Sequence, residues 1–212
     1  MSFLKKRIAQ KKNGGFTLIE LLVTIVIFVI LTGVVLFNQN GFNNTVLINN
    51  LAYDIALTIR QAQNYGVDVN ESQVNTFNAP YGVVFNTGNN KNFILFADTG
   101  TSGGVDTNGN PVPDYKYTGS GSCLASDPSD PECIQKYNIS SGSYIKSICT
   151  KKNGSACTLT NSLTILFQRP NPDALIYSDT GSADFADITV ASASGVIKDI
   201  IITGVGQIYV QK

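Results

Sequence analysis

Glu20 is the side chain with the most unusual setting in this chain of 212 residues, because it is the only charge between Phe16 and Phe37. A carboxylate inside a membrane-spanning helix is costly unless it finds a partner, so such a residue is a functional candidate by default. The natural partner is a cation at the same depth. Gly14 and Gly15 stand directly before Phe16, and a cut after Gly15 would create that cation, the α-amino group of Phe16.

Within one helix, the geometry for pairing between an amine at Phe16 and the carboxylate of Glu20 is unfavourable. The amine of a neighbouring subunit, shifted along the helix axis, would neutralise Glu20 and itself. Lateral assembly would then remove the free-energy cost of an unpaired carboxylate in the membrane, which the isolated subunit bears. We therefore expect Glu20 to act in assembly. The alternative is a glutamate near the helix end whose carboxylate extends to the membrane interface.

The element that must hold Glu20 is a long apolar helix. The run from Phe16 to Phe37 would span roughly 33 Å at about 1.5 Å per residue, which is enough to cross a bilayer. The leader before it carries no acid and five basic residues, Lys5, Lys6, Arg7, Lys11 and Lys12. Uncharged polar residues follow the run, so the charge asymmetry predicts a cytoplasmic N-terminus and a remainder on the outer side of the membrane.

The order of leader, glycine pair and apolar run distinguishes between types of N-terminal signal. A secretory signal peptide also begins basic, but its apolar region has about 7–15 residues and its cleavage site follows that region. Here the glycine pair precedes the apolar run, and Glu20 is the fifth residue after the expected cut. This arrangement, from about Lys11 to Phe37, resembles the class III signal of type IV pilins and pseudopilins.

The resemblance implies that a prepilin peptidase cleaves between Gly15 and Phe16 and methylates Phe16. It implies a structural subunit, not an enzyme, of a type IV pilus or a type II secretion pseudopilus. Its partners would be other pilin or pseudopilin subunits and an inner-membrane assembly platform. The protein would lie in the inner membrane before it enters the filament. The alternative is a minor pilin of a competence or adhesion pilus that binds DNA or another ligand.

The helix is expected to continue past the apolar run, because the first proline is Pro80. Apolar residues at helical spacing form an amphipathic stripe, and Gly66 is the expected end of the helix. The stripe contains Leu47, Leu51, Ile55, Ile59 and Ala62, with Ile48, Ala52 and Ala56 beside it. The expected parts are a leader 1–15, a transmembrane half 16–37, an amphipathic half 38–66 and a β-rich domain 67–212.

Short apolar runs separated by turn residues predict strands after Gly66. They are 81–85, 93–96, 163–167, 188–190, 200–202 and 207–210, and the last two are expected to form a hairpin. The expected fold class is α+β, with a long N-terminal helix packed on an antiparallel sheet. Within the pilin family, Leu51–Tyr65, Tyr81–Phe96 and Ile200–Val210 resemble minor pseudopilins of the GspH/FimT type.

An irregular loop is expected at about 98–160. Oxygen side chains alternate around a turn glycine in its first part, as in calcium-binding loops, and Asp98 is a further possible ligand. The candidate calcium ligands are Asp106, Asn108, Asn110 and Asp114. The closing glutamate of an EF-hand is missing. Asx turns, which bond their own backbone without an ion, are the alternative, so calcium is a possible cofactor and no other is expected.

The four cysteines, Cys123, Cys133, Cys149 and Cys157, lie in the part expected to face an oxidising space, where disulfides form. Four cysteines allow three pairings, of which the local one, Cys123–Cys133 with Cys149–Cys157, closes two short loops. A zinc site is disfavoured, because the chain has no histidine and no Cys-x-x-Cys pair.

Charge and composition argue against other functional classes. Removal of residues 1–15 leaves ten basic against fifteen acidic residues, so a general nucleic-acid surface is not expected. A DNA-binding pilin would be expected to cluster cations near the last hairpin, where only Lys198 and Lys212 occur. Without histidine, a Ser-His-Asp or Cys-His arrangement is impossible.

Overall fold

The computed structural model describes residues 14–37, 39–68, 79–100, 112–123, 130–140 and 142–211. Its contacts divide the chain into two compact units. The first ends at Phe42 and the second begins at Asn43.

The first unit contains helix α1 (Leu18–Phe37), and α2 (Gln39–Val67) begins after it. Among the described residues, Leu18–Leu36 is the one helix segment long and apolar enough to cross a membrane, and none of it is buried. The hydroxyls of Thr24 and Thr32 donate to the carbonyls of Leu21 and Phe28, each at 2.8 Å. Both hydroxyls are therefore satisfied inside the helix, as a lipid environment requires. The segment fits a membrane anchor.

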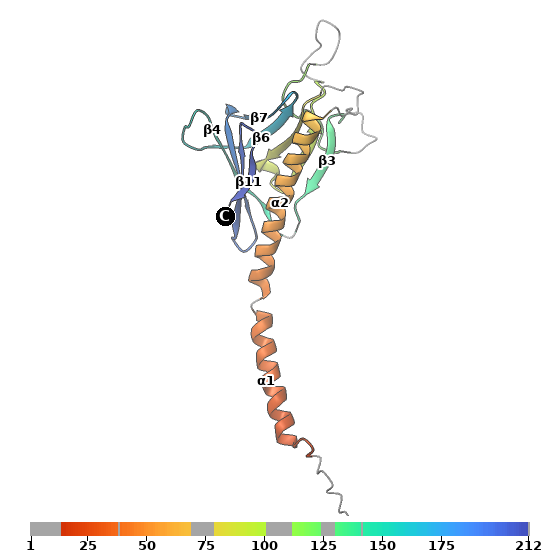
Figure 1. Ribbon diagram of the computed structural model, residues 1–212, viewed down its shortest axis with the longest axis vertical. Coiled ribbons are helices and arrows are strands. Elements are labelled where there is room, and N and C mark those ends of the chain that lie inside the picture. The colour runs from red at the N-terminus through yellow and green to blue at the C-terminus, as the bar shows by residue number, and fades with distance from the viewer. Residues whose placement is uncertain are drawn as a thin grey trace, which may run out of the picture. The chain divides into compact units, whose positions relative to one another are not determined.

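In the second unit, α2 packs its apolar face on two antiparallel sheets (Figure 1). The fully buried positions of this face are Ile48, Ala52, Ile55, Ile59 and Ala62. The face is therefore centred slightly to one side of the expected stripe, because Leu47 is 37% exposed and Leu51 is only partly buried.

Gly66 lies inside α2, which ends at Val67. A Cβ at this position would overlap the carbonyl oxygen of Phe167. The absence of a side chain at Gly66 therefore allows the helix and the strand that contains Phe167 to approach closely, and we correct its expected role as the helix stop.

The six-stranded sheet has the order β3-β2-β1-β6-β7-β8 and the five-stranded sheet the order β11-β10-β9-β4-β5, and every neighbouring pair is antiparallel. The strands of the first sheet are β1 (Tyr81–Asn86), β2 (Asn92–Ala97), β3 (Cys133–Asn138), β6 (Ser162–Gln168), β7 (Asn171–Ser178) and β8 (Gly181–Ala183). Those of the second are β4 (Tyr144–Lys151), β5 (Thr158–Thr160), β9 (Phe185–Ala191), β10 (Ile197–Thr203) and β11 (Ile208–Gln211). A short 3-10 helix, η1 (Thr87–Asn89), connects β1 to β2.

The main core lies between α2 and the inward faces of both sheets. Alternate residues such as Val83 and Phe85 of β1, or Ile188 and Val190 of β9, are fully buried, as the two-residue period of a strand requires. The first five predicted runs lie in β1, β2, β6, β9 and β10, and the sixth, 207–210, overlaps β11, which begins one residue later. The expected α+β class, with antiparallel sheets and a β10–β11 hairpin, is confirmed.

The stretch 98–160, expected to be irregular, contains strands β3, β4 and β5. A β-bulge between Ile145 and Ser147 interrupts the alternation of β4, and β3 is an edge strand with few aliphatic residues. Both features weaken the periodic signal on which the prediction depended. The strands β7 and β8 were also not predicted.

Candidate functional site

The expected cleavage junction lies in an exposed segment without regular structure, Gly14–Thr17, directly before α1. The carbonyl oxygen of Thr17 accepts hydrogen bonds from the backbone N–H groups of Glu20 at 3.1 Å and Leu21 at 3.2 Å. The Thr17 hydroxyl oxygen accepts from the same Glu20 N–H at 3.3 Å. Thr17 is therefore the N-cap of α1, and the Gly15–Phe16 bond stands just outside the helix.

Glu20 occupies the first turn of α1 and is exposed. The free N–H groups and the dipole of a helix N-terminus favour a negative charge there. Phe16 is 80% exposed. Glu20 thus lies at the start of an apolar helix. It is close in sequence to Phe16, the residue that would carry the new amine. The pairing of Glu20 with a neighbour's amine stays a prediction.

The four cysteines form two disulfides, Cys123–Cys133 and Cys149–Cys157, with Cα–Cα separations of 5.1 and 5.7 Å. This is the local arrangement among the three that the sequence allowed. Cys149 lies in β4, and its partner lies just before β5, so this disulfide joins β4 to the segment that leads into the neighbouring strand. The other disulfide ties a long connection to edge strand β3.

That connection includes residues 112–123, here called the strap, which covers part of the outer face of the six-stranded sheet. Tyr115 stacks on Tyr177 with ring centroids 5.6 Å apart, and Tyr117 packs on Phe96 at 5.4 Å. Together with Cys123 these tyrosines pack on a second, smaller core of Ile94, Phe96, Cys133 and Leu166. The strap is therefore a packed element, although the sequence suggested an irregular loop.

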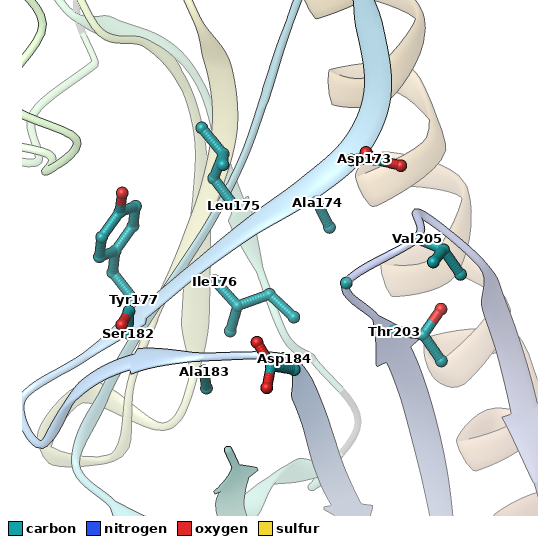
Figure 2. Close-up of a pocket in the computed structure, with 11 residues that line it drawn as sticks. Asp173, Ala174, Leu175, Ile176, Tyr177, Ser182, Ala183, Asp184, Thr203 and Val205 are labelled. Atoms are coloured by element: carbon teal, nitrogen blue, oxygen red, sulfur yellow. The ribbon is translucent and has the colours of Figure 1, made fainter. Parts of the chain in front are cut away.

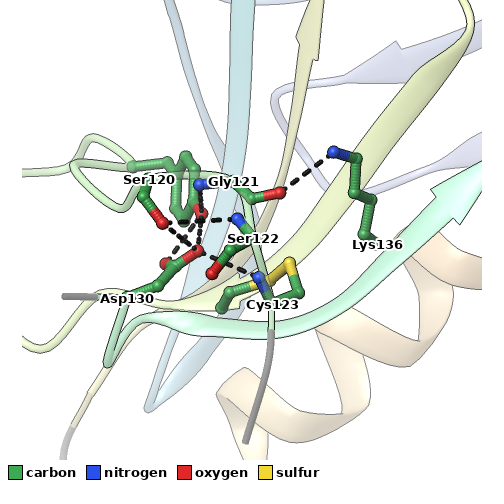
Figure 3. The surroundings of a disulfide bond; sticks show 8 residues. Ser120, Gly121, Ser122, Cys123, Asp130 and Lys136 are labelled. Carbon is green, nitrogen blue, oxygen red and sulfur yellow. Dashed lines mark hydrogen bonds between the residues drawn. A yellow bond between two sulfur atoms is a disulfide. The ribbon is translucent and has the colours of Figure 1, made fainter. Parts of the chain in front are cut away.

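Two buried carboxylates, Asp130 and Glu132, hold the strap in place, and Figure 3 shows Asp130 beside the disulfide. Asp130 accepts hydrogen bonds from the Tyr117 hydroxyl at 2.7 Å and from the Cys123 N–H at 3.2 Å. Glu132 accepts from the Thr118 N–H at 2.8 Å. Burial raises the pKa of Tyr117, and its hydrogen bond to Asp130 raises it further. The phenol therefore keeps the proton that it donates.

Asp98 binds the two ends of the loop that runs from Gly100 to the start of the strap. Its carboxylate is fully buried and accepts backbone N–H groups from Gly100 at 3.2 Å, Asp114 at 3.4 Å and Tyr115 at 2.7 Å. Burial raises the pKa of Asp98 to about 6, and the bonds from Tyr115 and Gly100 oppose that rise. Gly100 adopts φ +71°, and a Cβ there would overlap the carbonyl oxygen of Val112. Asp98 thus joins both ends of the loop.

Three of the candidate calcium ligands, Asp106, Asn108 and Asn110, lie outside the described residues. The fourth, Asp114, accepts the backbone N–H of Lys116 at 2.9 Å, which is the Asx-turn geometry considered as the alternative. The one group of three possible metal ligands among the described residues is Cys123, Asp130 and Cys133, and its two sulfurs are joined in a disulfide. Its thiols are therefore not free to bind a metal.

An open cavity of about 580 Å³ lies where the chain crosses from β8 to β9, beside the β10–β11 turn (Figure 2). Asp173 and Asp184 lie at its border, with Thr203 and Val205 on the turn side. The Gly204 N–H donates to the Asp184 carbonyl at 2.7 Å, which holds the turn against the crossing segment. Because the chain has no histidine, a histidine-dependent catalytic triad cannot be built here.

Sequence reasoning missed Thr17, Tyr117, Asp130 and Glu132 as residues that shape these sites. A local signal existed for Thr17, since Thr-x-x-Glu directly before an apolar run is a capping-box pattern. No local signal marks the other three, because their partners come from different parts of the chain.

Residues 10–36 match the family model of the prokaryotic N-terminal methylation motif. No curated protein and no solved structure matches the chain significantly. The motif indicates a type IV pilin-like protein or pseudopilin that a prepilin peptidase processes and that assembles with other pilin subunits. This class is structural rather than catalytic.

Proposed function

We propose that the chain is a minor subunit of a type IV pilus or of a type II secretion pseudopilus, of the GspH/FimT type. The observation that carries the proposal is the junction itself. An exposed, non-helical Gly14–Thr17 segment, which lies within the methylation motif of residues 10–36, runs directly into an apolar helix with no buried residue between Leu18 and Leu36. A prepilin peptidase would cut between Gly15 and Phe16 and methylate Phe16.

An apolar helix of this kind requires lipid or other helices around it. Before processing, the inner membrane supplies the lipid, and the basic leader favours a cytoplasmic N-terminus with the globular domain outside. After processing, helices of neighbouring subunits replace the lipid, and an inner-membrane platform adds the subunit to the filament. Glu20 then pairs with the Phe16 amine of the neighbour. Two disulfides in the globular domain support its placement in an oxidising space.

The minor role rests on features of the globular domain. The α2 helix, the β1–β2 pair with its following loop, and the closing β10–β11 hairpin correspond to the segments that resemble GspH/FimT pseudopilins. The strap adds a disulfide-bonded outer layer to one sheet. The acidic mature chain and the scarcity of cations at the last hairpin favour a structural role over DNA binding.

The decisive experiment is the intact mass and N-terminal sequence of the protein, co-expressed with its own prepilin peptidase and recovered without reductant. We expect a chain that begins at methylated Phe16 and is lighter by two protons for each of two disulfides. A chain that still begins at Met1 would refute the proposal and would leave Glu20 without its cation.

We also propose calcium as a ligand of the loop through Asp106, Asn108, Asn110 and Asp114. Asp98 is left out of this set, because three backbone N–H groups already bind its carboxylate. A calcium titration followed by calorimetry tests the proposal, with Asp106→Asn as the variant and Asp173→Asn as an exposed control outside the loop. Equal binding by both variants, or none by the unaltered chain, would refute it.

A further inference from the structure

We infer that Thr17 is a positioning residue for processing, because it starts α1 just beyond the Gly15–Phe16 bond and thereby keeps that bond in a non-helical, exposed segment. The inference rests on the proposed function, since it requires that a prepilin peptidase cuts this bond. In the reaction, water adds across the amide. The C–N bond breaks, Gly15 gains the hydroxyl as its new carboxyl group, and the nitrogen of Phe16 gains a proton as its new amino group.

The hydrogen bonds at the start of α1 support this role. The Thr17 hydroxyl oxygen and carbonyl oxygen both accept the backbone N–H of Glu20, at 3.3 and 3.1 Å, and the carbonyl also accepts from Leu21 at 3.2 Å. An N-cap residue itself has a non-helical backbone. The helix therefore begins at Leu18, and Gly14–Thr17 carries no regular structure and is exposed.

The residue types on both sides of Thr17 are also those of a helix start at this position. Thr17 and Glu20 have the spacing of a capping box, and Phe16 and Leu21 occupy the two positions of a hydrophobic staple, directly before the cap and at the fourth helical residue. Gly15, together with the glycine before it, opposes extension of the helix toward the leader, because glycine loses the most backbone freedom in a helix.

An exposed segment without regular structure is the form in which a peptide bond is most open to proteolysis. Helical residues engage their backbone groups within the helix and present a curved chain. Loss of the cap would no longer disfavour helices that begin before Thr17, in which the Gly15–Phe16 bond is helical, and would thereby lower the fraction of precursor in the cleavable form. A lower competent fraction raises the apparent KM and leaves kcat unchanged.

The cap does not compete with the assembly role of Glu20. Its bonds use the backbone N–H of Glu20 and leave the carboxylate out. They also use no residue before Thr17, so the helix start survives removal of the leader.

The test is the rate at which prepilin peptidase cleaves the full-length precursor in membranes, followed by intact mass at several substrate concentrations. Thr17→Val keeps the side-chain shape but removes the capping oxygen. We expect a loss of up to about fivefold in kcat/KM, through KM, because fivefold is the factor that corresponds to the ~1 kcal/mol of a lost threonine cap. Thr24→Val is the matched control, because its hydroxyl bonds only within the helix, to Leu21, and we expect no change.

Two further variants separate capping from direct recognition of the hydroxyl. Serine caps at least as well as threonine, and glycine caps nearly as well although it has no hydroxyl. We therefore expect Thr17→Ser and Thr17→Gly to stay within about twofold of the unaltered precursor. If Thr17→Gly is as slow as Thr17→Val, or if Thr17→Val equals Thr24→Val, the inference is wrong. Failure of the peptidase to cut the unaltered precursor would instead refute the proposed function.

Discussion

At the scale of single residues, Glu20 differs from the buried carboxylates of the globular domain in where the groups that stabilise its charge come from. Asp98, Asp130 and Glu132 lose water on folding, but each receives backbone or hydroxyl donors from within the chain, which offset part of that loss. Glu20 is exposed at a helix start in the separate subunit. We propose that its compensation comes from outside the chain once the helix enters a membrane or a filament.

Glu20→Gln tests this need for an external partner. We expect normal membrane insertion but at least about a tenfold loss of incorporation into filaments, because the neighbour's Phe16 ammonium would lack its anion in an apolar setting. The measurement is the fraction of subunit in sheared filaments against the fraction in membranes. Asp173→Asn, which alters an exposed carboxylate of the globular domain, is the control. Full incorporation of Glu20→Gln would contradict the pairing.

Asp187 of β9 provides a pH-dependent prediction. Its Oδ1 is buried without a hydrogen-bond partner in the described part of the chain. Burial raises the pKa of Asp187, Asp199 raises it further, and Lys151 partly opposes the rise. A raised folded-state pKa favours the protonated form, so stability present at low pH is lost as the pH rises above the ordinary value of 3.8.

Asp187→Asn removes this titration. We expect the variant to melt a few degrees higher than the unaltered protein at pH 8, and the difference to disappear near pH 4. Thermal melts of the mature protein in detergent at both pH values measure this, with Asp173→Asn as control. A difference that is equal at pH 4 and pH 8 would show that ionisation of Asp187 does not limit stability.

At the scale of elements, the contact between α2 and β6 depends on one glycine. Gly66 lies against the Phe167 backbone, which cannot retreat without disturbing β6 and its neighbours β1 and β7. Gly66→Ala should therefore destabilise the globular domain by ~2 kcal/mol, within the range seen for overpacked cores. Gly33→Ala is the matched control, because a Cβ at that helical glycine meets nothing within 4 Å. Equal melting temperatures for the two variants would contradict the close contact.

The strap is the element that should open most easily by itself, because its small core has only four buried residues in the described part of the chain. The disulfide Cys123–Cys133 closes a separation of ten residues and is expected to contribute ~2.5 kcal/mol. The double variant Cys123→Ser with Cys133→Ser should expose the strap to limited proteolysis while the main melting transition remains.

The matched variant Cys149→Ser with Cys157→Ser removes a disulfide that joins β4 to the segment before β5. Cleavage sites mapped by mass should lie in 112–123 for the first variant and not for the second. Unfolding of the whole domain by loss of Cys123–Cys133 would show that the strap is part of the main folding unit.

At the scale of the whole molecule, the chain separates an apolar anchor from a domain with its own core. The second unit begins at Asn43 and contains the buried face of α2, both sheets and both disulfides. A unit with its own core is expected to fold alone. Residues 43–212 should therefore give a soluble, folded protein with two disulfides that does not enter filaments. Circular dichroism, non-reducing intact mass and filament fractionation test this, and an unfolded product would make the domain dependent on its anchor.

The sequence by itself determined the features that depend on neighbouring residues. The glycine pair, the single charge in an apolar run and the helical spacing of Ile48 to Ala62 are local patterns, and they predicted the junction, the anchor and α2. Six strands were also predicted, because their apolar runs are compact. The position of Thr17 as the helix cap was available from the same local pattern, through its spacing to Glu20.

Only the tertiary structure decided which distant residues meet. Asp98 holds the loop through Asp114 and Tyr115, and Asp130 holds Tyr117, across intervals that no periodicity encodes. Gly66 looked like a helix stop, but the approach of Phe167 gives it a different role. Such contacts depend on how the sheets and α2 stack to bury apolar surface, which is a property of the whole core, whereas sequence patterns report the period of one element at a time.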